Sequence, residues 1–345
     1  ISTHSVKMVD LILKYNSKTS FVNRKTENGS ALFIATKNND IPIIKRLLEV
    51  PGIDLNVVDQ RNYSIMMHVC ETNKRDILKI FLQSGLADTN ISSPQNGNSL
   101  LMQSIVVGNN EVAELLINYD KTDINAQNYQ GQTALTIASN KNSFSIVDLL
   151  INNPKFNSEE SRLGYAFYSS TGEASNHLIH AKGFDVNFKN VQRNNNSVGF
   201  AIGSNDNEVY DTPLMHAADT SNDNLIDLII KHPTFDKEKS RLDSAIFIAI
   251  RRNNQQIFRK LVELDGRDIN EIKSKNVSIY ATVLNNRSFN IINDLLNDPH
   301  FKPDKKDIPM TFVNLFFFPE SEVLPLLRKL CNNFKEHEVL IDFTK

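Results

Sequence analysis

Histidine and cysteine are the side chains with which this chain could hold a metal ion or attack a substrate. Its 345 residues include eight histidines and two cysteines. His177 and His180 are three residues apart and would share one face of a helix, but no cysteine or acidic residue accompanies them at a ligand spacing. We therefore expect ordinary polar side chains there and no metal site. The alternative is a metal ion bound by the two histidines.

The two cysteines do not indicate a disulfide framework. Cys70 occupies a position that suits close helix packing, and Cys331 lies far away in the sequence. Cysteines that remain free thiols are typical of proteins in a reducing compartment. We expect the protein in the cytoplasm, with the nucleus as the alternative.

Sequence signatures of catalysis are also missing. The chain has no Gly-x-Ser-x-Gly elbow, no phosphate-binding loop and no dinucleotide fingerprint. The adjacent pair Glu159-Glu160 cannot share a helix face, so it favours a polar helix start rather than paired acid–base catalysis. The sequence predicts a protein that is not an enzyme and binds no cofactor.

Charge and hydropathy narrow the classes of partner. The 38 Lys and Arg residues balance 40 Asp and Glu residues, a net charge of −2, which argues against nucleic acid as a partner. Short basic stretches at Arg24-Lys25, Arg251-Arg252 and 302–306 are expected to be solvated surface, with phosphoprotein or lipid contact as the alternative. No apolar run approaches the roughly 18 residues of a membrane span. The aromatic run at 312–318 fits the core of a C-terminal unit, with an exposed docking patch as the alternative.

Any functional side chain must be positioned by a repeat that runs through the sequence. Six similar segments begin at Ser30, Ser64, Ser99, Thr133, Thr212 and Ser244, which are 34, 35, 34, 79 and 32 residues apart. Each segment is followed by an apolar pair such as Leu47-Leu48, and then by a polar stretch. Self-similarity at such a period indicates a stacked repeat architecture.

Each repeat has the pattern of two helices. The opening Ser or Thr suits a helix N-cap or first turn. A large apolar residue follows two positions later and a small one five positions later, as in Leu32 and Ala35. Small residues allow helices to approach closely. Apolar residues at helical spacing, such as Ile146, Val147 and Leu150, mark the second helix.

The repeat resembles the ankyrin repeat, a unit of roughly 33 residues with two antiparallel helices and a projecting hairpin. Thr212-Pro213-Leu214-Met215-His216-Ala217-Ala218 is similar to the first-helix motif of that family, and 123–133 is similar to its hairpin. The resemblance implies an all-α repeat solenoid of stacked ankyrin helix pairs with short β-hairpin or loop fingers.

The repeats also set the expected domain organisation. We predict one elongated domain with a partial repeat at 1–23, about eight repeats at 24–302 and C-terminal capping helices at 303–345. The unit at 158–187 is degenerate, and 188–210 is an insertion or an enlarged hairpin. A solvated loop and a loop folded onto a binding face both remain open for that stretch. In the last repeat, Asn276 is placed at the opening position.

Two departures from the family pattern concern turns and histidines. Asparagine replaces the usual glycine between helices, as in Lys37-Asn38-Asn39-Asp40, and it tolerates the left-handed conformation that such a turn needs. The motif histidine is shifted by one residue at His68 and His216. This shift argues against hydrogen bonding between repeats through that position.

The resemblance further implies a concave surface of hairpin tips and first helices that binds proteins. The matching positions here that we expect to contact a partner are Glu27, Gln60, Arg61, Tyr63, Asn96, Asn98, Tyr129, Gln130 and Gln132, beside Gly29 and Gln95. Lys37, Glu71, Val106 and Asn140 fall near the ends of the corresponding first helices. Tyrosine is enriched at binding hot spots, so Tyr63 and Tyr129 are the foremost candidates.

The functional expectation is a non-enzymatic scaffold that binds a partner protein and is a monomer rather than an obligate oligomer. The partner's identity does not follow from the residues. An alternative is the targeting or adaptor arm of a larger enzyme, channel or ubiquitin ligase, because the chain starts at Ile1 with half a repeat and is expected to be cut from a longer protein.

Overall fold

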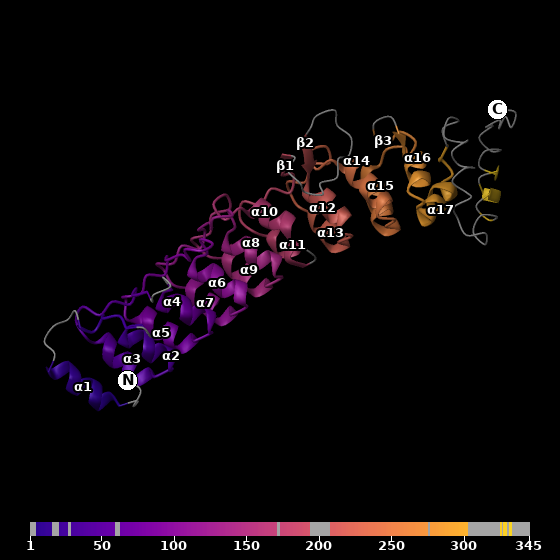
Figure 1. Ribbon diagram of the computed structural model, residues 1–345. Coiled ribbons are helices and arrows are strands. Elements are labelled where there is room, and N and C mark those ends of the chain that lie inside the picture. Colours follow the sequence, from indigo (N-terminus) through magenta and orange to yellow (C-terminus); the bar gives the residue numbers. More distant parts are fainter. Residues whose placement is uncertain are drawn as a thin grey trace. The chain divides into compact units, whose positions relative to one another are not determined.

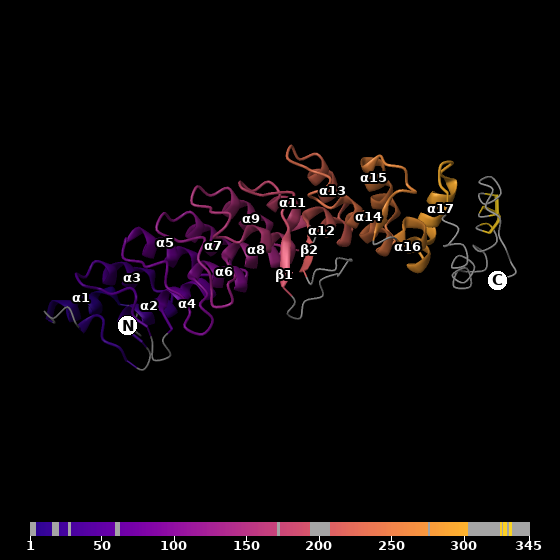
Figure 2. The same ribbon diagram turned by 90° about the horizontal axis from the view of Figure 1, so that it is seen from above.

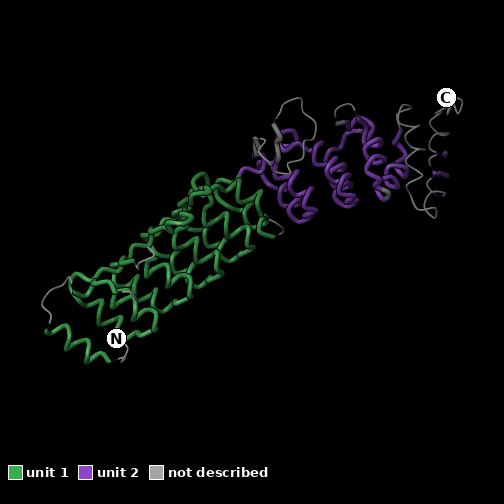
Figure 3. The backbone as a smooth tube through the Cα atoms, viewed as in Figure 1, with its two compact units in different colours: residues 1–184 green, residues 185–345 purple. Residues whose placement is uncertain are grey.

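The computed structural model describes residues 5–15, 21–26, 29–58, 63–170, 173–193, 208–274, 277–302, 325, 327–329 and 331–332. The chain divides into two compact units, residues 1–184 and residues 185–345 (Figure 3). Within the described residues no helix is both long enough and apolar enough to cross a membrane. The single elongated domain and its repeat boundaries stay a prediction.

The first unit consists of short helices that follow one another in pairs (Figure 1). They are α1 (Val6–Tyr15), α2 (Ala31–Lys37), α3 (Ile41–Leu48), α4 (Ile65–Glu71), α5 (Arg75–Gln83), α6 (Leu100–Val107), α7 (Asn110–Ile117), α8 (Ala134–Asn140), α9 (Phe144–Ile151), α10 (Leu163–Ser169) and α11 (Glu173–Leu178). The first helices α2, α4, α6, α8 and α10 contact one another in that order, and α5, α7, α9 and α11 form the second layer. Helix α1 packs against α3, as a second helix would.

The second unit repeats this arrangement with fewer pairs (Figure 2). It contains β1 (Asn190–Arg193), β2 (Glu208–Asp211), α12 (Pro213–Asp219), α13 (Asp223–Ile230), α14 (Leu242–Arg251), α15 (Gln255–Asp265), β3 (Lys273–Ser274), β4 (Val277–Ser278), α16 (Ile279–Asn285) and α17 (Phe289–Asn297). Helix α14 contacts both α12 and α16, so its first helices also stack on one another. The predicted helical repeat architecture is therefore confirmed in each unit.

The opening serines and threonines begin the first helices, as predicted. The hydroxyl oxygens of Ser30, Ser64 and Thr212 accept hydrogen bonds from backbone N–H groups three residues later, at 3.2, 3.0 and 3.3 Å. Ser244 differs because α14 starts three residues earlier, after Arg241, which places Ser244 in the first turn. The placement of Asn276 at the opening position was wrong, because Ser278 caps α16 through the N–H of Ala281.

The large and small positions of the repeat form the core of each unit. Leu32, Met66, Leu101, Leu135, Leu214 and Ile246 are each at most 1% exposed. The small residues Ala35, Val69, Ser104, Ala138, Ala217 and Ala249 are completely buried. Since the first helices touch at these positions, a larger side chain would force neighbouring repeats apart.

The turns between paired helices use the left-handed backbone conformation that the asparagines predict. Asn39, Asn73, Asn142 and Asn253 have φ between 52° and 58°. Ser221 and Arg287 adopt the same conformation, with φ of 54° at both. The conformation is thus a property of the repeat, and residues less suited than glycine or asparagine also accept it.

The segments that precede first helices are hairpins in most repeats. Single antiparallel bridges join Val58 to Ser64, Ser92 to Ser99 and Gln127 to Thr133. Strands β1 and β2, near the two ends of the 188–210 stretch, pair antiparallel with Asn190 opposite Asp211. The assignment of that stretch as an insertion or an enlarged hairpin stays a prediction. The middle of the stretch, 194–207, lies outside the described residues, as does most of the predicted C-terminal cap at 303–345.

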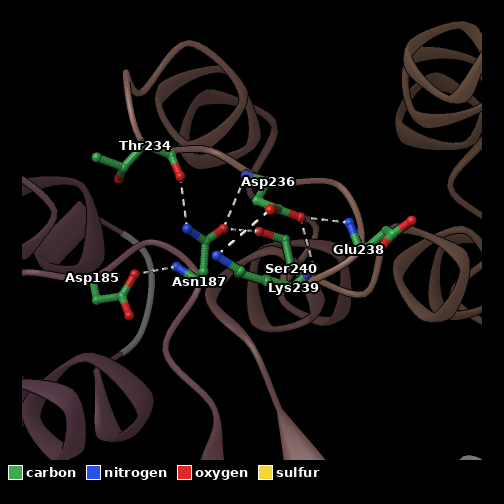
Figure 4. Close-up of polar contacts among 7 residues, drawn as sticks. All are labelled: Asp185, Asn187, Thr234, Asp236, Glu238, Lys239 and Ser240. Atoms are coloured by element: carbon green, nitrogen blue, oxygen red, sulfur yellow. Dashed lines mark hydrogen bonds and ion pairs between the residues drawn. The ribbon is translucent and has the colours of Figure 1, made fainter.

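Asparagines tie the connecting segments of successive repeats together. Asn187 is one example: its Nδ2 donates to the Thr234 carbonyl at 2.7 Å, and its Oδ1 accepts from the Asp236 N–H at 3.0 Å and from the Ser240 hydroxyl at 2.7 Å (Figure 4). Asparagines that bind a carbonyl and an N–H about 30 residues or more ahead in this way are Asn23, Asn90, Asn125, Asn187 and Asn270. We call them the inter-repeat asparagines, and they explain why a polar residue recurs after the buried apolar one.

Candidate functional site

A chain of polar side chains crosses three consecutive hairpins of the first unit. The Tyr63 hydroxyl donates to Oε2 of Glu71, and Nε2 of Gln103 donates to Oε1 of Glu71 at 2.9 Å. Nδ2 of Asn98 donates to Oε1 of Gln103 at 3.3 Å. The side chains come from α4, α6, the hairpin between these helices and, for Tyr63, the hairpin before α4, so repeat stacking brings them together.

The next hairpin continues this connection through Asn128. Nδ2 of Asn128 donates to Oδ1 of Asn98 at 2.7 Å and to Oε1 of Gln132 at 3.2 Å. Its Oδ1 accepts the N–H groups of Gln130 and Gln132 at 3.0 and 2.8 Å. An asparagine amide can donate two and accept two hydrogen bonds, so all of this capacity is used. We call the residues Tyr63, Glu71, Asn98, Gln103, Asn128 and Gln132 the hairpin network.

Tyr129 lies beside this network and is 72% exposed. Its N–H donates to the Asn96 carbonyl at 3.1 Å, and its ring lies against Gly97. A Cβ at Gly97 would come within 2.6 Å of Tyr129 Cδ1, and Gly97 has φ of +74°, so only glycine suits this position. One face of the aromatic ring is therefore supported while the residue stays open to solvent.

A second exposed aromatic residue, Tyr165, lies one repeat further along the chain, on the first helix α10. Nη1 of Arg162 donates to the Gly131 carbonyl at 2.6 Å, and the guanidinium lies 4.7 Å from the ring centre of Tyr165. Tyr165 is 47% exposed on α10. Arg162 and Tyr165 were not predicted as site residues because their repeat is degenerate, although a Tyr near the start of a first helix is a usable signal.

A groove of about 390 Å³ opens between the hairpins that flank α4. Its lining consists of Asn56, Val58, Tyr63, Ser64, Met67, Glu71, Asn90, Ile91, Ser92, Ser93, Pro94 and Gln95. The lining includes Tyr63, which was predicted as a contact residue, and Glu71, which was placed at the end of a first helix. We call this cavity the Glu71 groove.

The predicted contact residues fall into four groups. Asn96, Tyr129 and Gln130 are exposed, while Tyr63 and Gln132 are half-buried. Asn98 differs from the expectation: it is only 6% exposed, and its amide is used inside the protein, so it supports the hairpins instead of presenting a contact. Glu27, Gln60 and Arg61 lie outside the described residues.

His68 lies under this surface. Its ring contacts Phe33 and meets the Tyr63 ring edge-on, with centroid distances of 5.8 and 6.5 Å. Burial, with further contributions from Lys74 and Lys37, lowers the pKa of His68 and favours the neutral imidazole. Its Nε2 is buried and makes no hydrogen bond, between repeats or within one, among the described residues.

His177 has a partner that sequence spacing did not reveal. Its Nδ1 lies 2.8 Å from Oδ1 of Asp148, and its ring stacks on Phe144 at 5.3 Å. In the part of the chain that is described, no group of three or more His, Cys, Asp or Glu side chains could hold a metal ion. The His177–Asp148 contact joins α11 to α9.

Parts of this chain are similar in sequence to known proteins. The family model for ankyrin repeats (three copies) matches residues 32–128. A putative ankyrin repeat protein, L371, of Acanthamoeba polyphaga mimivirus is 27% identical over 130 residues, covering 38% of this chain and 17% of that protein. The tyrosine-protein kinase HTK16 of Hydra vulgaris is 26% identical over 146 residues, covering 42% of this chain and 18% of the kinase. The matches thus span less than a fifth of either relative.

Among solved structures, the crystal structure of EF0377, an ankyrin repeat protein, is 28% identical to this chain and has a TM-score of 0.40. It covers 46% of this chain, which in turn covers 80% of that one. The family match lies on the repeats whose capped first helices, paired helices and hairpins are described above. Residues 32–128 of this chain are therefore ankyrin repeats.

Proposed function

We propose that the protein is a non-enzymatic scaffold that binds a partner protein through the hairpin tips and first helices of its first unit. Ankyrin repeats generally mediate protein–protein interactions. The observation that carries the finer proposal is Tyr129, which is 72% exposed although its backbone and ring are held by Asn96 and Gly97.

The physical reason is preorganisation. An exposed side chain that is free to rotate loses conformational entropy when a partner fixes it. Tyr129 has already lost much of that freedom against Gly97, so a partner that covers its open face gains apolar contact at a lower entropic cost. Tyr165, supported by Arg162, offers a second anchor on the same series of repeats.

The test is quantitative capture of partner proteins from native cells with immobilised wild-type and variant chains. Tyr129→Ala is expected to weaken capture at least about tenfold, as truncation of a hot-spot tyrosine does. Tyr15→Ala is the matched control, because Tyr15 is also exposed, at 81%, but lies on α1. Equal capture by wild type and Tyr129→Ala, with Tyr165→Ala also without effect, would contradict the proposal.

A second candidate is that the chain serves as the targeting arm of a larger protein. It is favoured by the match to under a fifth of the length of two relatives, one of them named a tyrosine-protein kinase. The full reading frame of the gene tests this idea. An open frame that encodes only these repeats would contradict it.

A further inference from the structure

Glu71 is the one charged residue among the described residues that line the Glu71 groove. The other lining side chains supply hydroxyl and amide groups, as Ser92 and Gln95 do, or apolar surface, as Met67 and Pro94 do. A single carboxylate in an otherwise neutral groove determines the sign of charge that the groove can accept.

The orientation of that carboxylate is fixed by its neighbours. The Tyr63 hydroxyl holds one oxygen, and Gln103 Nε2 holds the other at 2.9 Å. Nδ2 of Asn109 also binds the Glu71 carbonyl at 3.1 Å, so the main chain is anchored as well. Glu71 is thereby positioned before any ligand arrives.

The carboxylate keeps capacity for a further donor. An ionised carboxylate has about four acceptor positions, and the two hydrogen bonds use only part of them. None of the described residues forms an ion pair with Glu71, although other carboxylates such as Asp219 and Asp294 are paired with arginines. Glu71 is also the last residue of α4, and the C-terminal end of a helix favours a cation.

We propose that the Glu71 groove binds the cationic side chain of a lysine or arginine in an extended segment of the partner protein. The ammonium or guanidinium group pairs with the Glu71 carboxylate, and the aliphatic stem lies on Met67 and Pro94. The Ser92 hydroxyl and Nε2 of Gln95 are placed to bind the main chain of the same segment, while the Ser93 hydroxyl donates to Gln95 Oε1 at 2.6 Å. This inference rests on the proposed function, since it names the chemistry that the partner presents at one part of that surface.

The experiment uses blocked tripeptides as probes and the full chain labelled with ¹⁵N. Acetyl-Gly-Arg-Gly-amide and acetyl-Gly-Lys-Gly-amide are titrated separately, and the neutral analogue acetyl-Gly-citrulline-Gly-amide is the matched probe. We expect at least one cationic peptide to shift the amide signals of Ser92, Ser93 and Gln95 in a saturable way. The citrulline peptide is expected to bind at least about tenfold more weakly, because it lacks the charge.

Variants of the protein supply the second comparison. Glu71→Gln is expected to reduce binding of the cationic peptides at least about tenfold, while Glu111→Gln, an exposed carboxylate on α7, leaves it unchanged. Equal binding of citrulline and arginine peptides by wild type overturns the proposal even if Glu71→Gln weakens the fold. Equal binding of the arginine peptide by wild type and a folded Glu71→Gln also overturns it.

The outcome is separable from that of the proposed function. Partner capture that depends on Tyr129 while the cationic peptides fail would leave the scaffold standing and remove only the role of Glu71. Binding of one cation alone would support the proposal and identify the residue that the partner uses.

Discussion

Asn128 shows how single buried amides determine the shape of the binding face. It is 7% exposed, and its side chain joins the Asn98 amide of one hairpin to Gln130 and Gln132 of its own. Each such bond contributes only about 1 kcal/mol net, but a buried amide without partners costs more than that. The exposed Tyr129 is therefore positioned by a buried neighbour, Asn128, whose hydrogen-bonding capacity is used within the protein.

Cys70 gives a prediction at the same scale. Burial raises the pKa of the Cys70 thiol well above its ordinary value, with a smaller contribution from Glu71. Since the thiolate is the nucleophile, native protein at pH 8 is expected to react with a thiol reagent only at the exposed Cys331. Mass spectrometry after labelling counts the modified thiols.

The control for this prediction is Cys331→Ser, which is expected to remain unlabelled until denaturant is added. The sign of the pH dependence also follows. The unfolded chain ionises Cys70 above about pH 8.5 while the folded chain keeps it neutral, so the free energy of unfolding falls as pH rises beyond that value. Rapid labelling of Cys70 in the native state would contradict its burial.

At the scale of the element, the repeat imposes a backbone conformation that its residues only partly suit. The turn between α12 and α13 places Ser221 at φ of 54°, where a side chain other than glycine or asparagine is strained. Similar strain at Arg287 shows that stacking of the flanking helices overrides local preference. Turn residues are thus positions at which this fold can be stabilised.

We expect Ser221→Gly to raise the free energy of unfolding by about 0.5 kcal/mol, since relief of strain exceeds the entropy that glycine adds to the unfolded chain. Ser221→Ala removes the same hydroxyl but keeps a Cβ, so it is expected to leave stability unchanged or lower it. Chemical denaturation of the three proteins measures the order. Greater stability of the alanine variant would contradict a left-handed turn.

Helix starts are the features that local sequence predicts best in this chain. Ser30, Ser64 and Thr212 were identified as helix starts, and the capping bonds confirm them. The prediction at Asn276 was wrong, because α16 begins after Ser278, whose hydroxyl accepts from the N–H of Ala281. Arg162 and Arg241 were not recognised as helix starts either, because their left-handed conformation is not one that arginine prefers.

At the scale of the whole molecule, each helix pair contacts mainly the pairs beside it. Stability in such proteins is approximately a sum of repeat and nearest-neighbour contributions. The inter-repeat asparagines add to the nearest-neighbour contribution, as the bonds of Asn187 to Thr234, Asp236 and Ser240 illustrate. A local change is therefore expected to have a local effect.

Asn187→Ala tests this expectation. Loss of its three hydrogen bonds is expected to destabilise the surrounding repeats by about 2 kcal/mol, which corresponds to a roughly 30-fold faster amide exchange in α12 to α15. Exchange in α2 to α5 of the first unit is expected to be unchanged. Hydrogen–deuterium exchange measured by mass spectrometry resolves the two regions.

The matched control for this variant is Asn224→Ala, an exposed asparagine on α13. It is expected to change exchange little in either unit. A uniform increase throughout the chain after Asn187→Ala would show that the molecule unfolds as one cooperative body, contrary to the expectation.

The sequence by itself determined the repeat, the helix pairs, the caps and the asparagine turns, because each depends on residues only a few positions apart. The tertiary structure alone decided which side chains meet across repeats. Gln103 reaches Glu71 from 32 residues away, Arg162 reaches Gly131 from 31, and His177 reaches Asp148 from 29. These separations along the sequence are close to the length of one repeat. The directions of the side chains, however, depend on how one pair of helices packs on the next. That packing made Asn98 a buried support and Tyr129 an exposed anchor, although both belong to the same predicted surface.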